Sequence, residues 1–147
     1  MKAKDFMIKD VISLNEEASI KTLLEVLMKN KIGGLPLVDP NNKLLGIVTD
    51  GDVLRYMNPK AFISSYVTYI EELDETLKSK SESPVKAIMK KKVVFVREED
   101  ELEDVLKLLA THHFKKIPVV NENREVVGVI SRGDMIRKLG ELLLEKL

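Results

Sequence analysis

Apolar residues in the first third of the chain change from short runs to a helical spacing and back to short runs. One stripe has the i, i+3, i+4, i+7 spacing of a helix with one buried face, and it comprises Ile20, Leu23, Leu24 and Leu27. Three runs rich in β-branched or aliphatic residues predict strands at 11–14, 35–38 and 44–48. A polar turn separates the last two runs, so they predict a hairpin. A closing helix is predicted from about Asp50.

The same pattern recurs further along the chain at a fixed offset. Residues 4–57 align with residues 86–139 without a gap, and each pair lies 82 positions apart, as Met7 and Met89 do. Identical pairs include Pro36 with Pro118, Gly46 with Gly128 and Asp52 with Asp134. A repeat at a fixed offset indicates two copies of one supersecondary unit. We therefore predict an α+β fold of two βαββα repeats packed about a pseudo-twofold axis.

The domain boundaries follow from this repeat. We predict a first repeat at 4–57, a helical insert or linker at 58–84, and a second repeat with a C-terminal helix at 85–147. Pro59 ends the first closing helix, because proline lacks an amide donor and disfavours a helical conformation in the residue before it. Aromatic and aliphatic residues at three- to four-residue spacing predict that much of the insert is helical. It could cover its own module or contact a partner subunit.

Composition narrows the classes of function. The 24 basic residues balance the 24 acidic ones, so no global field favours nucleic acid or a membrane surface. Cysteine is absent, which excludes disulfides and thiolate sites, and a disulfide-free domain fits a reducing cytoplasm. No apolar run approaches the ~20 residues needed to span a bilayer. We expect a cytoplasmic protein that binds neither membranes nor nucleic acid.

The most specific string runs from Gly46 to Asp52 and is echoed from Gly128 to Asp134. Each copy places a hydroxyl and a carboxylate three residues apart, where a strand leads into a helix. The carboxylate could accept both hydroxyls of a ribose, and the helix N-terminus attracts anions. The same spacing is also that of a capping box, in which both side chains bind backbone amides of the first turn. Recurrence in both repeats, each time behind a Gly-led apolar strand, favours a binding site.

Together, the apolar-Pro-Val segment, the polar turn, the Gly-x-x-Thr/Ser-x-x-Asp string and the closing helix resemble the cystathionine-β-synthase (CBS) domain. Two in tandem are similar to a CBS pair, or Bateman module. The resemblance implies a regulatory module that binds AMP, ADP, ATP or S-adenosylmethionine in clefts between the repeats, usually as a homodimer. It implies ribose binding by Thr49, Asp52, Ser131 and Asp134. It implies adenine pockets formed by Ile12, Leu35, Pro36 and Ile47, and by Val94, Ile117, Pro118 and Val129.

The repeats differ where phosphates are expected to point. The second repeat carries Lys115, Lys116 and Arg132, whereas the first has Gly33, Gly34 and Asp50 at the matching positions. We infer that these three cations meet the phosphates of a ligand held by Asp52. The cleft led by Asp134 is then poorer for polyphosphate. The alternative is that the lysine pair is simply a solvated part of the surface.

Other classes of function find less support. His112 and His113 are adjacent, so on a helix their side chains would point about 100° apart and chelate a metal poorly. No P-loop, nucleophile–base arrangement or metal-ligand set is present, and we expect neither catalysis nor a required cofactor. The remaining alternative is an interaction module that binds no nucleotide and docks on a partner through the insert. In that case Asp52 and Asp134 are only helix caps.

Overall fold

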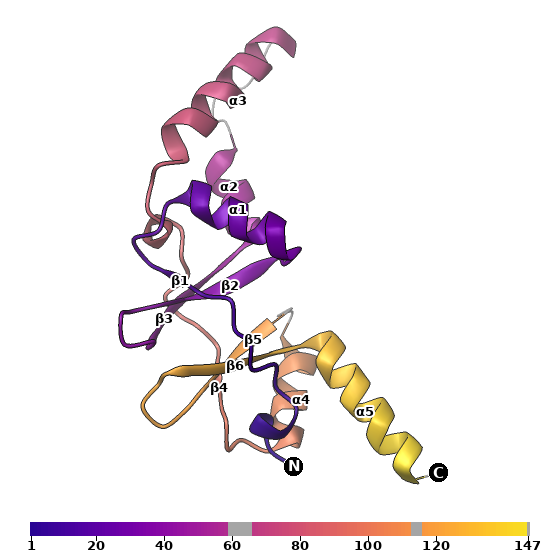
Figure 1. Ribbon diagram of the computed structural model, residues 1–147. Coiled ribbons are helices and arrows are strands. Elements are labelled where there is room, and N and C mark those ends of the chain that lie inside the picture. Colours follow the sequence, from indigo (N-terminus) through magenta and orange to yellow (C-terminus); the bar gives the residue numbers. More distant parts are fainter. Residues whose placement is uncertain (59–65, 113–115, 147) are drawn as a thin grey trace. The chain divides into compact units, whose positions relative to one another are not determined.

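The computed structural model describes residues 1–58, 66–112 and 116–146 (Figure 1). The chain forms two compact units, and each combines segments that lie far apart in the sequence. Unit 1 comprises Met1–Ile12, Pro40–Leu44 and Lys92–Leu147, and unit 2 comprises Ser13–Asp39 and Leu45–Lys91. No helix within the described residues is long and apolar enough to cross a bilayer.

The first repeat supplies most of unit 2. Its elements are β1 (Leu14–Asn15), α1 (Ile20–Asn30), β2 (Gly34–Val38), β3 (Leu44–Thr49) and α2 (Asp50–Met57). The strands form a sheet in the order β1-β2-β3, with β1 parallel to β2 and Leu14 opposite Leu37. The insert adds helix α3 (Tyr66–Lys80), and the 3₁₀ helix η2 (Val85–Ala87) follows it. The predicted stripe of α1 is confirmed, since Ile20, Leu23 and Leu27 are buried.

Unit 1 repeats this arrangement with the second half of the chain. It contains the 3₁₀ helix η1 (Ala3–Asp5), β4 (Val96–Arg97), α4 (Leu102–Thr111), β5 (Lys116–Val120), β6 (Val126–Ser131) and α5 (Arg132–Lys146). Strand β4 runs parallel to β5, and β5 pairs antiparallel with β6, with Ile117 opposite Ile130. The predicted α+β fold with two βαββα repeats is confirmed. The first strand of each repeat is shorter than predicted and begins later, at Leu14 and at Val96, because only two of its residues pair with the next strand.

Each unit is completed by a short segment from the start of the other repeat. Segment 1–8 bonds to the start of the second repeat through Ala3 N to Asp100 O (2.8 Å) and Lys4 N to Glu98 O (3.0 Å). Segment 83–90 bonds in the matching way to the first repeat, through Val85 N to Ala18 O (2.8 Å) and Lys86 N to Glu16 O (3.0 Å). Ala3 and Val85 are both fully buried. The compact units therefore divide the chain differently from the sequence repeat.

The packing of these segments on the other repeat explains why each repeat carries a glycine at the third position of its last strand. Lys90 and Ile47 exchange two backbone hydrogen bonds of 2.9 and 3.1 Å, and Ile8 and Val129 exchange two of 2.9 and 3.0 Å. A Cβ on Gly46 would lie 2.8 Å from the carbonyl oxygen of Lys90. At Gly128, a Cβ would collide with the side chain of Met7. Glycine leaves room for segment 83–90 to pass directly over β3 and for segment 1–8 to pass over β6. We call each of these two the crossing segment of its unit.

Candidate functional site

The first candidate pair, Thr49 and Asp52, lies where β3 leads into α2. The carboxylate of Asp52 is buried, and its Oδ2 accepts hydrogen bonds from the backbone N (2.9 Å) and the Oγ1 (3.1 Å) of Thr49. These bonds close the first turn of α2 as a capping box. The capping interpretation of this pair is therefore confirmed for the first repeat. A ribose-binding role for the same groups stays a prediction.

The other carboxylate oxygen of Asp52 faces two cations. Its Oδ1 accepts a hydrogen bond of 2.7 Å from Arg55 of α2 and lies 3.7 Å from the Nζ of Lys90. Arg55 and Lys90 are largely exposed, whereas Asp52 is 7% exposed. A buried carboxylate requires such partners, because removal of a charge from water is costly unless it is paired. The buried carboxylate of Asp52 is thus paired with two cationic side chains that are themselves largely exposed.

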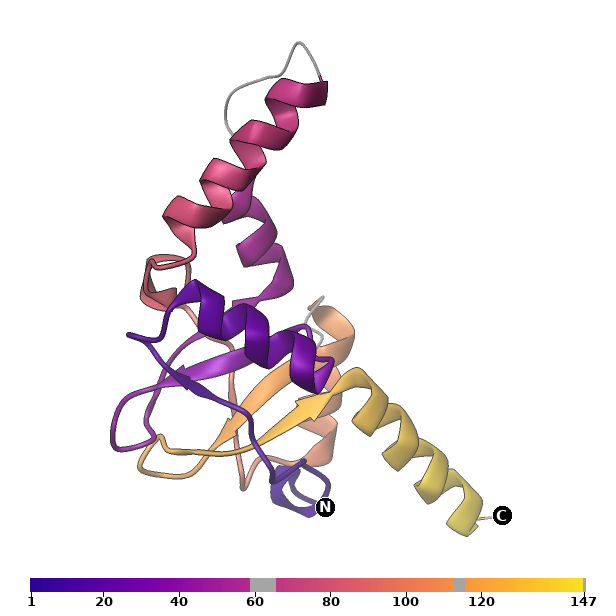
Figure 2. The ribbon, with the colours of Figure 1, turned by 45° about the horizontal axis from the view of Figure 1, so that its top comes forward.

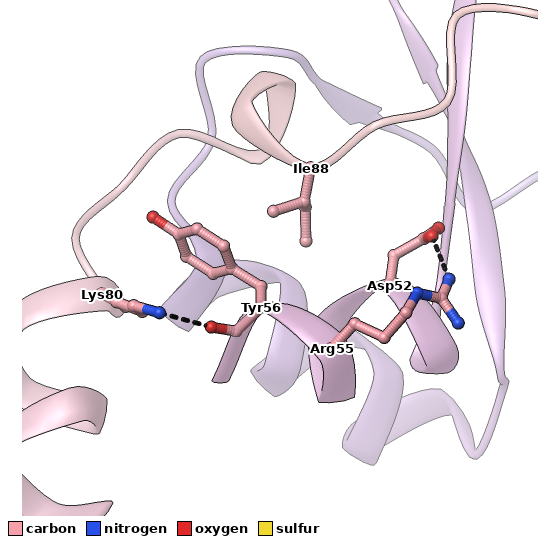
Figure 3. A pocket seen from close by; sticks show the side chains of 5 residues that line it. All are labelled: Asp52, Arg55, Tyr56, Lys80 and Ile88. Carbon is pink, nitrogen blue, oxygen red and sulfur yellow. Dashed lines mark hydrogen bonds and ion pairs between the residues drawn. The ribbon is translucent and has the colours of Figure 1, made fainter. Parts of the chain in front are cut away.

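A hollow of about 380 Å³ lies beside Asp52 within unit 2 (Figure 3). It is lined by Asp52, Arg55, Tyr56, Lys80 and Ile88. The close-up shows the ring of Tyr56 on one side of Ile88 and the Asp52–Arg55 pair on the other. The hollow therefore combines an aromatic and an aliphatic surface with both signs of charge.

Lys80 attaches the end of the insert helix α3 to α2. Its Nζ donates a hydrogen bond of 2.6 Å to the carbonyl oxygen of Tyr56 and lies 4.7 Å from the centroid of the Tyr56 ring. The hydroxyl of Tyr56 in turn contacts the Oγ of Ser83 at 3.0 Å. Sequence reasoning missed Tyr56, Lys80 and Lys90 because none belongs to the repeated motif. Tyr56 lies one helical turn after Asp52 on α2, whereas only the fold brings Lys90 and Lys80 to this hollow and its edge.

The second candidate pair, Ser131 and Asp134, occupies the same position at the start of α5. Asp134 is buried, and its Oδ2 accepts hydrogen bonds of 2.8 Å from both the backbone N and the Oγ of Ser131. The Oγ of Ser131 accepts a hydrogen bond from the Asp134 backbone N at 3.1 Å. Arg137 binds the remaining oxygen. Where unit 2 has Lys90, unit 1 has Ile8, so no lysine from the crossing segment reaches Asp134.

Six of the eight residues predicted to enclose adenine lie on strands. Ile12 and Val94 were predicted on the first strand of each repeat, but they precede β1 and β4. Leu35 and Pro36 are buried on β2, and Ile117 and Pro118 are buried on β5. The other four are partly exposed: Ile12, Ile47, Val94 and Val129. Val94, Ile117 and Pro118 belong to unit 1, as do Ser131 and Asp134. Ile12 also belongs to unit 1, whereas Leu35 and Pro36 belong to unit 2. Their role as base pockets stays a prediction.

The predicted phosphate ligands are only partly described. Lys116 is the first residue of β5 and is partly buried, and Arg132 is the exposed first residue of α5. Arg132 donates a hydrogen bond of 3.1 Å to the carbonyl oxygen of His112. Lys115 and His113 lie outside the described residues. The role of these cations toward a ligand held by Asp52 stays a prediction. Among the described residues, no three His, Asp or Glu side chains are grouped as a metal site would require.

Comparison with known proteins connects this architecture to one family. The CBS domain family matches the chain twice, at residues 3–59 and 85–141. Protein MJ1426 of Methanocaldococcus jannaschii is 27% identical over 154 residues, which cover 95% of this chain and 91% of that protein. Inosine-5'-monophosphate dehydrogenase of the same organism is 32% identical over 93% of this chain, but the match spans only 23% of the enzyme.

Among solved structures, CBSX2 in complex with AMP is 26% identical. The match has a TM-score of 0.76 and covers 96% of this chain and 97% of that chain. The chain spans 54% of the full CBSX2 protein of Arabidopsis thaliana. The likeness therefore covers both repeats and the insert of this chain, and only part of some longer relatives.

Proposed function

The chain belongs to the CBS domain family, and we propose that it is an adenine-nucleotide-binding regulatory module without catalytic activity of its own. The observation that carries this proposal is the match, over 96% of the chain, to CBSX2 in complex with AMP. The match to inosine-5'-monophosphate dehydrogenase also supports the proposal. The chain matches only 23% of that enzyme, so a stretch similar to this chain is one part of a much longer enzyme.

The ligand is an adenosine compound, namely AMP, ADP, ATP or S-adenosylmethionine. The ribose hydroxyls bind Asp52 with Thr49, or Asp134 with Ser131, because a carboxylate accepts two hydroxyl donors at once. The base lies against the apolar residues named above on β2 and β3 or on β5 and β6. Lys115, Lys116 and Arg132 neutralise the phosphates of the ligand at Asp52.

Binding is transmitted as a shift between states that differ in affinity for the ligand. The module acts in the cytoplasm as a homodimer, and its regulated target is a protein. In unit 2 the Lys80–Tyr56 contact supports such transmission, since it joins the helix that carries Asp52 to the insert.

Thermal shift with AMP, ADP, ATP, S-adenosylmethionine and GTP tests this proposal on wild type, Asp52→Asn and Asp134→Asn. Asparagine keeps an oxygen that can accept the capping hydrogen bond but loses the charge and one acceptor. A ligand at a hundred times its Kd adds roughly 2.7 kcal/mol to stability. We expect an adenine nucleotide, and not GTP, to stabilise wild type and Asp134→Asn, and to stabilise Asp52→Asn much less. If no compound stabilises wild type, the proposal is wrong.

A second candidate function is a module that binds proteins and no nucleotide. The capping box at Asp52 favours it, because that box already gives Thr49 and Asp52 a structural role. In that case the difference in melting temperature between each asparagine variant and wild type is the same with and without nucleotide.

A further inference from the structure

Two arginines of unit 1 lie beside one aromatic ring, near the turn between β5 and β6. The guanidinium carbon of Arg124 lies 4.9 Å from the centroid of the Phe95 ring, and that of Arg97 lies 5.9 Å from it. Arg97 is the last residue of β4 and pairs with Val120, the last residue of β5 before the turn. Figures 1 and 2 both show this turn at the end of the β5–β6 hairpin away from α5. The parallel pairing of β4 and β5 therefore brings both arginines to the same end of the sheet.

The first repeat lacks this cluster of a ring and two cations. The residues at the three matching positions are polar and uncharged: Ser13, Asn15 and Asn42. Both repeats nevertheless form a two-residue first strand and a hairpin at these places. The fold of a repeat therefore requires neither an aromatic ring nor positive charge there.

Arg124 occupies a position in the turn that favours a different residue. Its φ is 63°, in the left-handed region that asparagine and glycine adopt most readily, and its counterpart Asn42 has a φ of 64°. The turn holds this conformation, because the Arg124 N donates to the Asn121 O at 3.0 Å and its carbonyl oxygen accepts from the Leu44 N at 3.1 Å. Asparagine would meet these backbone requirements at less cost. The arginine is therefore explained by its side chain.

Contact with the ring leaves the charges of both arginines without acidic partners. Phe95 is partly buried, whereas Arg97 and Arg124 are exposed. None of the ion pairs among the described residues includes either arginine. A guanidinium group can stack by its face on a ring while its N–H donors, which lie in its plane, bind a carboxylate. The ring thus positions two cations that can accept an anion from outside unit 1.

We propose that Arg97 and Arg124 bind an acidic segment of a partner protein. Guanidinium groups match carboxylates in a bidentate geometry, and a stacked side chain loses less freedom on binding. Glu98 follows Arg97, and Glu122 lies two positions before Arg124, so the positive charge is confined to a narrow area. The phosphate backbone of a nucleic acid requires a more extended basic surface. This surface goes beyond nucleotide binding and uses none of the residues assigned to it.

Titration of the full chain with a capped octapeptide of glutamate, followed by NMR without nucleotide, tests the proposal. A glutamine octapeptide is the uncharged comparison, and a uridine octanucleotide is the comparison that carries phosphates. The variants are Arg97→Gln and Arg124→Asn, of which the second places the residue of the first repeat in the turn. Lys107→Gln is the control, because it removes one exposed positive charge from α4.

We expect the glutamate peptide to shift the side-chain Nε–Hε resonances of Arg97 and Arg124, and the glutamine peptide to leave them unchanged. Arg97→Gln and Arg124→Asn should each raise the Kd of the glutamate peptide roughly fivefold or more, while Lys107→Gln leaves it unchanged. Each titration is made well below the melting temperature of the variant, so that a change in stability cannot imitate a loss of binding.

An unchanged Kd in both arginine variants overturns the proposal, and a lower melting temperature of Arg124→Asn would then assign it a structural role alone. Equal weakening in Lys107→Gln overturns it as well, because net charge alone would then attract the peptide. If the uridine octanucleotide binds the same arginines as tightly, the acidic protein segment is the wrong partner. A wild type that does not bind the glutamate peptide also overturns the proposal. Nucleotide is absent throughout, so these outcomes are independent of the proposed function.

Discussion

The two units hold their crossing segments, 1–8 in unit 1 and 83–90 in unit 2, in the same way. They differ in the charges around these segments. Lys4 in unit 1 and Lys86 in unit 2 are counterparts, and each pairs with the matching glutamate, Glu99 or Glu17, at 2.7 and 2.6 Å. Unit 1 adds Lys2, which binds the same Glu99 at 2.7 Å. Unit 2 instead adds Lys90 beside Asp52.

Some features of the crossing segments are common to both units, and others are found in one unit alone. Backbone hydrogen bonds, the buried Ala3 or Val85 and the glycine under the crossing segment are common to both units. The extra cation lies at a different place in each. It strengthens the attachment of the N-terminal segment in unit 1 and adds positive charge at the candidate ligand carboxylate in unit 2. The scaffold is therefore duplicated, and the two candidate sites are not equivalent.

The largest effect is expected from a charge that is buried within each crossing segment. Ala3→Asp and Val85→Asp each place a carboxylate at a fully buried position, which should cost on the order of 3–5 kcal/mol. Hydrogen exchange should show that Ala3→Asp loosens β5 and β6, and that Val85→Asp loosens β2 and β3. If Ala3→Asp loosened β2 and β3 instead, the exchange of segments between the repeats would be wrong.

A milder change concerns the two glycines. Gly46→Ala should destabilise the protein by roughly 1–3 kcal/mol, because the new Cβ would meet a backbone oxygen that cannot move alone. Gly128→Ala should cost less, since its nearest obstacle is the flexible side chain of Met7. Urea denaturation measures both. Met7→Ala should restore part of the loss in Gly128→Ala, and the matching Met89→Ala should restore less in Gly46→Ala.

The smallest expected effect is electrostatic and sharpens the difference between the units. Hydrogen bonds from Lys2 and Lys4 lower the pKa of the exposed Glu99 from 4.5 to about 2. A pKa that is lower in the folded state stabilises it above about pH 4.5, and this contribution disappears as the pH falls toward 2. Glu99→Gln should therefore flatten the acid limb of a stability–pH curve. The effect should shrink in high salt, because these charges are exposed.

The lysine of the matching pair should respond at the other end of the pH scale. A hydrogen bond from Lys86 to Glu17, together with the charge of that glutamate, raises the pKa of Lys86 above 10.5. Its contribution is complete below that pH and disappears as the pH rises through the higher folded-state value. Lys86→Met should remove this alkaline contribution. Glu99→Gln should also remove an alkaline contribution, because a hydrogen bond to Glu99 raises the pKa of Lys2. An alkaline limb that stays unchanged in Lys86→Met would contradict the role of the Lys86–Glu17 pair.

The sequence alone determined the repeat, the order of the elements and the position of the hydroxyl–carboxylate pairs. Local spacing was sufficient, because the helical stripe of α1 and the polar turns act over a few residues. The capping bonds of Thr49 with Asp52 are local for the same reason.

Only the tertiary structure decided which segments complete each unit. The identity of Met7 with Met89 and of Gly46 with Gly128 marked two equivalent positions, but it could not show that each methionine packs on the glycine of the other repeat. Such a contact joins residues far apart in sequence, and no local pattern records it. The placement of Lys90 beside Asp52, and of Lys80 in the same hollow, depends on the same long-range packing.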